Sequence, residues 1–238
     1  MEVTFLGTGA AFSPDSYNAA ILVDRSLLLD AGAPLCVHLP RVGVSLDRPR
    51  AVLLTHFHAD HAFGLAAFIA GRLILHPDAS ALSVFGPVGT EGYVDHLLGF
   101  AWGEDIQRIA SGRVKVTELK DRERFEFDSY SGTAFEMRHS ARIPALGFAL
   151  ERNGIRLGYT GDAELCAGLN ALLGACDHLI TEMTYESPGA MHLSRDEIEM
   201  LVKAHPDVKF IVTHRGTEST VNGAIVARDF LTLQLPLR

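Results

Sequence analysis

Cysteine is scarce in this chain of 238 residues, which has three cysteines and no C-x-x-C spacing. The three are Cys36, Cys166 and Cys176. Such a pattern supplies neither a disulfide framework nor a set of thiolate metal ligands, so we expect reduced thiols. The chain also lacks any apolar run near the ~20 residues that span a bilayer. Its first residues carry no basic leader, and we expect a soluble, cytoplasmic protein.

Positive charge is also in deficit, because 21 lysines and arginines stand against 29 acidic residues, for a net charge of −8. This balance argues against binding long nucleic acid through bulk attraction, although it is compatible with a local basic pocket. No repeat, low-complexity tract or linker divides the chain. With 47% hydrophobic residues it can bury a substantial core, and we expect a single domain over residues 1–238.

Apolar runs bounded by turn residues predict many short strands, several of them apolar throughout as in strands buried on both faces. We expect strands at 3–7, 19–24, 26–32, 50–56, 72–76, 113–119, 133–138, 145–151, 155–160, 177–185 and 208–214. Helical spacing predicts helices at 64–71, 89–102, 163–174 and 222–230. A capping box of Ser194 and Glu197 predicts one more helix, which ends near residue 204.

The segment LLTHFHADHAFG, residues 53–64, places three histidines and one aspartate within six positions directly after an apolar run. Imidazole nitrogen and carboxylate oxygen are the groups that bind Zn²⁺ and similar divalent ions. A lone histidine after a strand is usually a surface or core residue. The pattern H-x-H-x-D-H in this position indicates a metal site instead.

Three further apolar runs end in a ligand-capable side chain, in the segments AFEMRH, IRLGYTGD and KFIVTH. Strands that end in this way deliver their side chains to one rim of a sheet. The resulting set exceeds the ligands of one tetrahedral zinc and suits two metals that share a carboxylate. The candidate ligands are His56, His58, Asp60, His61, His139, Asp162 and His214.

These motifs resemble, in this order along the chain, those of the metallo-β-lactamase superfamily. The resemblance implies an α/β fold, a four-layer αββα sandwich with a dinuclear metal site at one edge. It also implies a division of the ligands between two ions, with Asp162 as the bridge. One ion would be held by His56, His58 and His139, and the other by Asp60, His61 and His214.

The match is closest to the ribonuclease Z-like branch, which the segments VTFLGTGAAFSPDSYNAAILV, LLLDAG, FGPVGTEGYVDHLL, HSARIPALGFAL and TEMTY resemble. Ribonuclease Z has a flexible arm that grips transfer RNA, inserted between its third histidine and its bridging aspartate. Here His139 and Asp162 lie 23 positions apart, a distance that two strands and a turn fill. The branch's DCGEGTQ also reads DAGAPLC at residues 30–36. The resemblance therefore implies the metal chemistry without transfer RNA as the substrate.

In the ribonuclease Z-like pattern a glutamate pairs with a histidine that faces the scissile phosphate, and Glu182 in LITE and His192 in MHLS fit this pattern. The glutamate would orient the imidazole and raise its basicity, so that it can protonate a leaving alkoxide. The alternative is a helix-entry loop with an incidental histidine. We take His192, Glu182 and Asp60 as candidate catalytic residues, and Arg142 and Arg215 as weaker candidates for phosphate contact.

Four residues near the ligands are assigned structural roles. Gly64 and Gly161 would permit tight turns, Thr55 belongs to the strand that precedes the first ligand, and Asp30 would brace a loop or bond to a ligand histidine.

The combined motifs predict a dinuclear, metal-dependent phosphodiesterase that acts on small or cyclic phosphodiesters or on RNA. Its cofactor would be two divalent ions, zinc in the first place, with manganese and iron as alternatives. Two other functions stay open, a thioester or lactone hydrolase and a non-hydrolytic metal-binding accessory protein of cofactor biosynthesis. The Glu182–His192 pair favours the phosphodiesterase. Relatives of the branch are commonly dimers, so a homodimer is a further expectation.

Overall fold

The computed structural model describes residues 1–236 and arranges them as two seven-stranded sheets packed face to face. The first sheet has the order β14-β1-β2-β3-β4-β5-β6, in which the strands from β3 to β6 are parallel. These strands come from the first half of the chain, except for β14 at its end. Their bounds are β14 (Thr232–Gln234), β1 (Glu2–Gly7), β2 (Ala20–Val23), β3 (Leu27–Leu29), β4 (Ala51–Leu53), β5 (Leu82–Pro87) and β6 (Val114–Leu119).

The second sheet has the order β13-β12-β11-β10-β9-β8-β7. It is antiparallel from β7 to β10 and parallel from β10 to β13. Its strands are β13 (Ala224–Val226), β12 (Lys209–Arg215), β11 (His178–Met183), β10 (Ile155–Tyr159), β9 (Ala145–Arg152), β8 (Tyr130–Met137) and β7 (Arg124–Phe127).

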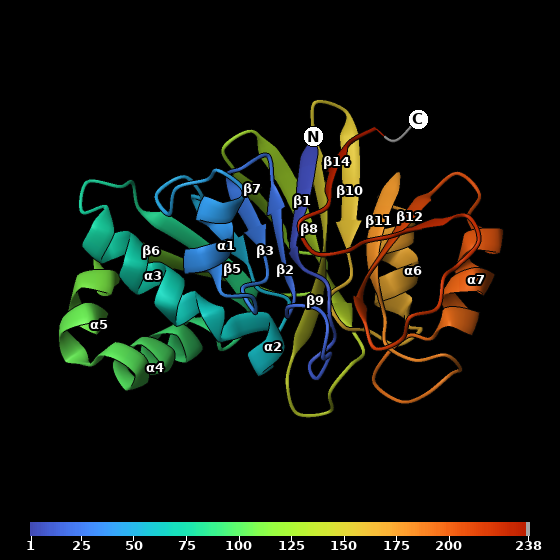
Figure 1. Ribbon diagram of the computed structural model, residues 1–238, viewed down its shortest axis with the longest axis horizontal. Coiled ribbons are helices and arrows are strands. Elements are labelled where there is room, and N and C mark those ends of the chain that lie inside the picture. Colours follow the sequence, from blue (N-terminus) through green and yellow to red (C-terminus); the bar gives the residue numbers. More distant parts are fainter. Residues whose placement is uncertain (237–238) are drawn as a thin grey trace.

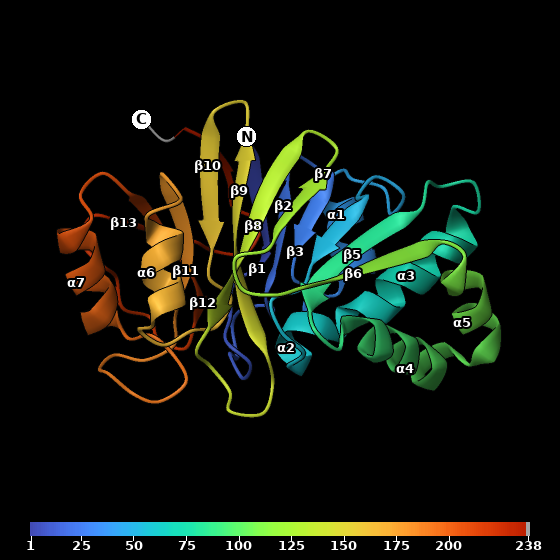
Figure 2. The same ribbon diagram turned by 180° about the vertical axis from the view of Figure 1, so that it is seen from behind.

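Helices cover the outer face of each sheet, so that four layers follow one another in the order helix, sheet, sheet, helix (Figures 1 and 2). The first sheet is covered by α1 (Leu35–Arg41), α3 (Gly64–Leu75), α4 (Thr90–Trp102) and α5 (Glu104–Ser111). The second sheet is covered by α6 (Ala167–Leu173) and α7 (Arg195–Ala204). The short helix α2 (Ala59–Ala62) lies between β4 and α3 in the chain. The fold is the four-layer αββα sandwich that the resemblance implied.

One part of the core lies between the two sheets, where fully buried side chains such as Phe5, Leu53 and Phe148 meet. Separate apolar layers fill the space between each sheet and its helices. A central strand such as β4 therefore faces apolar groups on both sides, which explains its continuous apolar sequence. Strands buried in this way form a rigid scaffold for the loops at their ends.

Two predicted elements are wrong. Residues 72–76 do not form a strand. Residues 72–75 continue α3, because Leu73 extends the buried face that Leu65 and Ile69 begin at intervals of four residues. The strand is supplied by the next apolar run, β5.

Residues 222–230 do not form a helix. Ala224–Val226 instead form β13, which pairs with β12. Gly223 has a φ of 85°, which interrupts helical geometry.

The other predicted strands and helices are confirmed within a few residues of their expected ends. The capping box is confirmed as well, because Ser194 Oγ accepts from the Glu197 amide while the Glu197 carboxylate accepts from the Ser194 amide. Within residues 1–236, no helix has the length and apolar character needed to cross a bilayer. The three cysteines are free thiols.

Candidate metal centre

The seven predicted ligands converge at one edge of the sandwich, where several strands end. The run from His56 to His61 follows β4 and overlaps α2, His139 follows β8, and Asp162 follows β10. His214 lies within β12, at a β-bulge where the pairing with β11 shifts register. Its φ of 44° is rare for a residue with a side chain. A bulge of this kind redirects a side chain, and here it brings the imidazole into the cluster.

Three histidines and one aspartate oxygen form the first half of the cluster. The His58 Nδ1 atom lies 3.0 Å from His56 Nε2 and 3.0 Å from His139 Nε2. Asp162 Oδ2 lies 3.8 Å from the same two Nε2 atoms. All of these atoms are within 4.8 Å of one another, as the ligands of a single ion must be.

The second half of the cluster shares Asp162 with the first. Asp162 Oδ1 lies 3.1 Å from His61 Nε2 and 3.4 Å from His214 Nδ1. Asp60 Oδ2 lies 3.1 Å from His214 Nε2 and 3.6 Å from His61 Nε2. The two oxygens of the Asp162 carboxylate thus face two different groups of ligand atoms.

Hydrogen bonds on the outer side of the histidines leave lone pairs pointing inward. The Thr55 hydroxyl donates to Asp30 and therefore accepts from His56 Nδ1, at 3.0 Å. His139 Nδ1 donates to the Met191 carbonyl oxygen, at 2.7 Å. In both rings the Nε2 atom is left as the acceptor. Outer-side partners that fix the tautomer in this way are typical of histidines that bind metals.

Asp30 is the hub of the buried network behind the cluster. Its carboxylate accepts from His61 Nδ1 at 2.8 Å, from the Thr55 amide at 2.8 Å and from the Tyr159 hydroxyl at 2.7 Å. Tyr159 comes from the second sheet, so this carboxylate joins the two sheets beneath the site. Asp30 thus bonds to His61, one of the predicted ligands, as the sequence suggested.

Electrostatics also fit a bound cation. Burial alone would raise the pKa of Asp162, but the surrounding histidines, His214 and His61 first, hold it well below its usual range. Burial lowers the pKa of His61, but the carboxylates of Asp162 and Asp30 more than offset this and raise it well above its usual range. His61 Nε2 and Asp162 Oδ1 are nevertheless buried without a hydrogen-bond partner. Two such atoms facing each other fit a metal ion between them.

Glu182 and His192 form a pair beside the metal ligands. Glu182 is fully buried in β11, and its Oε1 atom accepts from His192 Nδ1 at 2.9 Å. The Thr184 hydroxyl donates to Glu182 Oε2 at 2.6 Å and lies 3.2 Å from His214 Nδ1. Burial lowers the pKa of His192, but the hydrogen bond and charge of Glu182 more than offset this and raise it. The pair can therefore hold a proton on His192.

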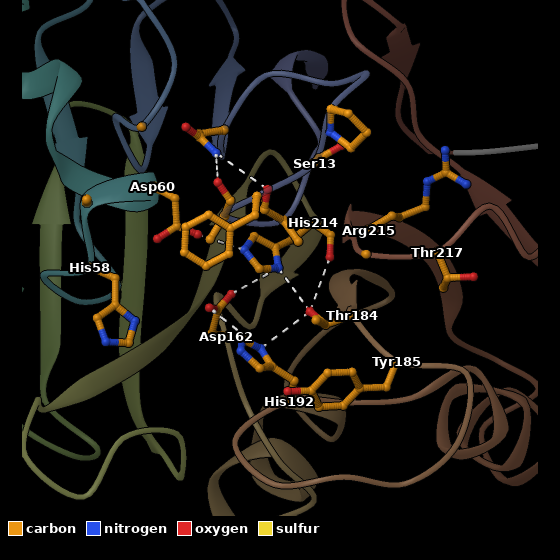
Figure 3. Close-up of a pocket in the computed structure, with 18 of the residues that line it drawn as sticks. Ser13, His58, Asp60, Asp162, Thr184, Tyr185, His192, His214, Arg215 and Thr217 are labelled. Carbon is orange, nitrogen blue, oxygen red and sulfur yellow. Dashed lines mark hydrogen bonds and ion pairs between the residues drawn. The ribbon is translucent and has the colours of Figure 1, made fainter.

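A cavity of about 1000 Å³ opens above the cluster. His192, Asp162 and His214 point toward one another at its floor (Figure 3). Its walls include the loop between β1 and β2 and the segment after β12. Among the lining residues, Phe12 is 98% exposed and Phe63 is 60% exposed, so both present apolar surface to a bound molecule.

Several other predictions have a definite outcome. Arg215 lines the cavity, whereas Arg142 is not among its lining residues. Gly161 adopts a φ of 57° and packs against Thr55, as expected of a tight turn. Gly64 differs, because it begins α3 without a positive φ and is needed for close approach, since a Cβ there would lie 2.4 Å from the Ala33 carbonyl oxygen.

Sequence reasoning missed several contributors to the site. Tyr159 and Thr184 bond to site residues through side chains that no motif marks out. Met191 contributes its carbonyl oxygen, which any residue type provides, so the sequence held no signal for it.

Comparisons with known proteins agree with this fold. Residues 1–224 match the family described as anti-Pycsar protein Apyc1. A ribonuclease Z from Mycolicibacterium gilvum is 32% identical over 195 residues, which cover 76% of this chain and 68% of the relative. The crystal structure of human tRNase Z, short form (ELAC1), has a TM-score of 0.79 at 22% identity and covers all of both chains. Zn²⁺-bound PqqB from Methylobacterium extorquens has a TM-score of 0.72 at 18% identity, over 99% of this chain and all of that one.

Proposed function

From the premise that the chain belongs to the anti-Pycsar protein Apyc1 family, within the ribonuclease Z-like branch of the metallo-β-lactamase fold, we propose that it is a dinuclear phosphodiesterase. Curated relatives carry the name of a hydrolase, and the chain is a metal-dependent hydrolase. Two divalent ions would be held, one by His56, His58 and His139 and the other by Asp60, His61 and His214. Asp162 would be their common ligand.

One observation carries the choice of a phosphodiester as the substrate. The Glu182 carboxylate accepts from His192 Nδ1 and raises the pKa of this imidazole, which favours a proton on it, and the same Nδ1 atom lies 3.7 Å from Asp162 Oδ2, at the border of the metal cluster. An alkoxide that leaves phosphorus needs such a proton. A protonated imidazole beside a two-metal cluster is therefore suited to cleaving phosphate esters.

The mechanism follows from this arrangement. Two metal ions held by these ligands would lower the pKa of a bound water, to give a nucleophile, and would counter the charge on the phosphate oxygens. Asp162 stays ionised because the histidines around it lower its pKa, so it remains available as a ligand. His192 donates its proton to the leaving oxygen. Glu182 accepts the hydrogen bond from His192 Nδ1, and in this way it stabilises the charged imidazole beforehand and fixes its orientation.

The surroundings of the site favour a small substrate. The 22 residues between His139 and Asp162 are taken up by β9, β10 and their connections, which leaves no segment there to grip a large RNA. The cavity of about 1000 Å³ has the size of a pocket for a small molecule. We propose small or cyclic phosphodiesters as the substrate class, zinc as the first metal, and the cytoplasm as the location.

The test is turnover by purified protein whose metal content has been counted by elemental analysis. The substrates are bis(p-nitrophenyl) phosphate, a cyclic nucleotide and an oligoribonucleotide, with a thioester and a lactone alongside. We expect hydrolysis of the phosphodiesters and its loss in His58→Ala. The matched control is His96→Ala, which removes an exposed histidine on α4 and should leave turnover unchanged.

Turnover of the thioester or the lactone without turnover of any phosphodiester would contradict the proposal. Bound metal without turnover of any of these esters would contradict it as well, and would favour a non-hydrolytic metal-binding protein.

A further inference from the structure

Three loops of the metal site are joined on its outer side by a polar cluster. The cluster consists of Arg138, Glu164 and the main chain of Met191, and is called the outer clamp below. Each member stands one or two positions from a residue of the site. The neighbours are His139 after Arg138, Asp162 before Glu164, and His192 after Met191. The outer clamp thus connects the three segments that carry these side chains.

Glu164 is the centre of the outer clamp. Its Oε2 atom accepts from Arg138 Nε at 2.6 Å, and its Oε1 atom accepts from the Met191 amide at 2.5 Å. The Glu164 amide in turn donates to the Arg138 carbonyl oxygen at 2.7 Å. The carboxylate is therefore fixed from both sides, and it fixes the Met191 backbone in turn.

Met191 passes this constraint to two histidines of the site. Its amide is held by Glu164, while its carbonyl oxygen accepts from His139 Nδ1 at 2.7 Å. Its φ of 72° lies in the left-handed region, which residues with a side chain seldom adopt. Backbone of this kind persists where the surroundings impose it. The next residue is His192, so the conformation of Met191 also fixes the backbone position of His192.

The loop that precedes His192 is exposed to solvent up to Met191. Residues 185–191 are all exposed, and buried packing resumes only at Leu193. The hydrogen bond from the Met191 amide to Glu164 Oε1 anchors Met191 on its N-terminal side. An exposed segment without buried contacts is expected to be among the least stable parts of a fold.

We propose that Glu164 is a positioning residue, which fixes the Met191 backbone and through it both the orientation of His139 and the place of His192. The part that concerns His192 rests on the proposed function, and the part that concerns His139 requires only that the site bind metal. If the surface ion pair between Arg138 and Glu164 served stability alone, it would contribute little to the free energy of unfolding. Its removal would then leave both histidines in place.

The experiment compares Glu164→Ala with the wild-type protein in two measurements. The first is Zn²⁺ affinity, determined by competition with a chelating dye, which needs no turnover. Loss of the partner behind a ligand histidine commonly costs 10–100-fold in metal affinity, and we expect about tenfold here. The second is kcat on two substrates. Bis(p-nitrophenyl) phosphate releases a group that leaves without a proton, whereas a cyclic nucleotide releases an alkoxide that needs one.

Misplacement of His192 should therefore lower kcat on the cyclic nucleotide about tenfold more than kcat on bis(p-nitrophenyl) phosphate. Glu164→Gln keeps an oxygen that can accept from the Met191 amide and should restore most of both properties. Asp177→Ala is the matched control, because it removes an exposed ion pair with Arg156 away from the site and should change neither.

The proposal is overturned if Glu164→Ala matches Asp177→Ala in both metal affinity and substrate ratio. If the wild-type protein hydrolyses no phosphodiester, the proposed function fails, and metal affinity alone decides the role of Glu164. A drop in Glu164→Ala then supports positioning of His139, and an unchanged affinity overturns it.

Discussion

Glu182 Oε1 lies 2.9 Å from His192 Nδ1, and this hydrogen bond joins a fully buried carboxylate to an imidazole at the floor of the cavity. The Glu182 end is fixed inside β11 by the Ala163 amide and the Thr184 hydroxyl, which both donate to it. The His192 end faces the metal ligands. A charge buried in the sheet thereby sets the protonation of a group that a substrate can reach.

Replacement of His192 by alanine should separate catalysis from metal binding. His192→Ala leaves the seven proposed ligands in place and should retain two ions per chain by elemental analysis. Because the leaving oxygen loses its proton donor, kcat on a cyclic nucleotide should fall by about 10²–10⁴-fold. His96→Ala serves as the control. Near-normal kcat in His192→Ala would remove this residue from the mechanism.

The pH dependence of kcat should report the Glu182–His192 pair. The hydrogen bond and charge of Glu182 raise the pKa of His192, so the acid form is present below that pKa and is lost as the pH rises through it. Glu182→Gln keeps the shape and removes the charge, which lowers the pKa of His192. The alkaline limb of the kcat profile should therefore move to lower pH. An unmoved alkaline limb would show that Glu182 does not control this proton.

Loss of Asp162 should reduce the number of bound ions, because its two oxygens face both halves of the cluster. We expect Asp162→Ala to hold at most one ion per chain after loading with zinc and removal of the excess. Asp15→Ala is the control, since it removes an exposed carboxylate from the same cavity wall and should keep two ions. Two ions retained in Asp162→Ala would refute the shared-ligand role.

Substitution of Asp30 should weaken metal binding without touching a proposed ligand. Asp30→Asn tolerates the positive φ of 59° at this position but replaces one acceptor oxygen of the carboxylate that orients His61. Zn²⁺ affinity should fall by about 10–100-fold. Tyr159→Phe removes a different donor to Asp30 and should have a smaller effect. Equal affinities in Asp30→Asn and wild type would show that the orientation of His61 does not depend on Asp30.

The convergence of the ligand candidates could be predicted because each follows or ends an apolar run. Strands that run in the same direction in one sheet, as β8, β10 and β12 do, end at the same edge. The packing of the two sheets brings the end of β4 beside them. The bulge at His214 could not be predicted, because a positive φ at a histidine has no reliable signature in the sequence. The short strands β13 and β14 were missed for a related reason, since they exist through pairing with distant strands rather than through their own pattern.

The support of the ligands was harder to predict than the ligands themselves. Asp30 could be suspected from its place after an apolar run, but its partner Tyr159 comes from the other sheet and only tertiary packing joins them. The Met191 carbonyl oxygen and the Glu164 carboxylate act through main-chain bonds, which leave no trace in residue type. Sequence patterns therefore indicate what a site contains more readily than what holds it in place.

The measurement that tests the central claim most directly is phosphodiester turnover during stepwise addition of zinc to metal-free protein. If two ions share Asp162 and act together, hydrolysis of bis(p-nitrophenyl) phosphate should reach its maximum at two equivalents per chain. Full activity at one equivalent, or two bound equivalents without turnover, would contradict a dinuclear phosphodiesterase.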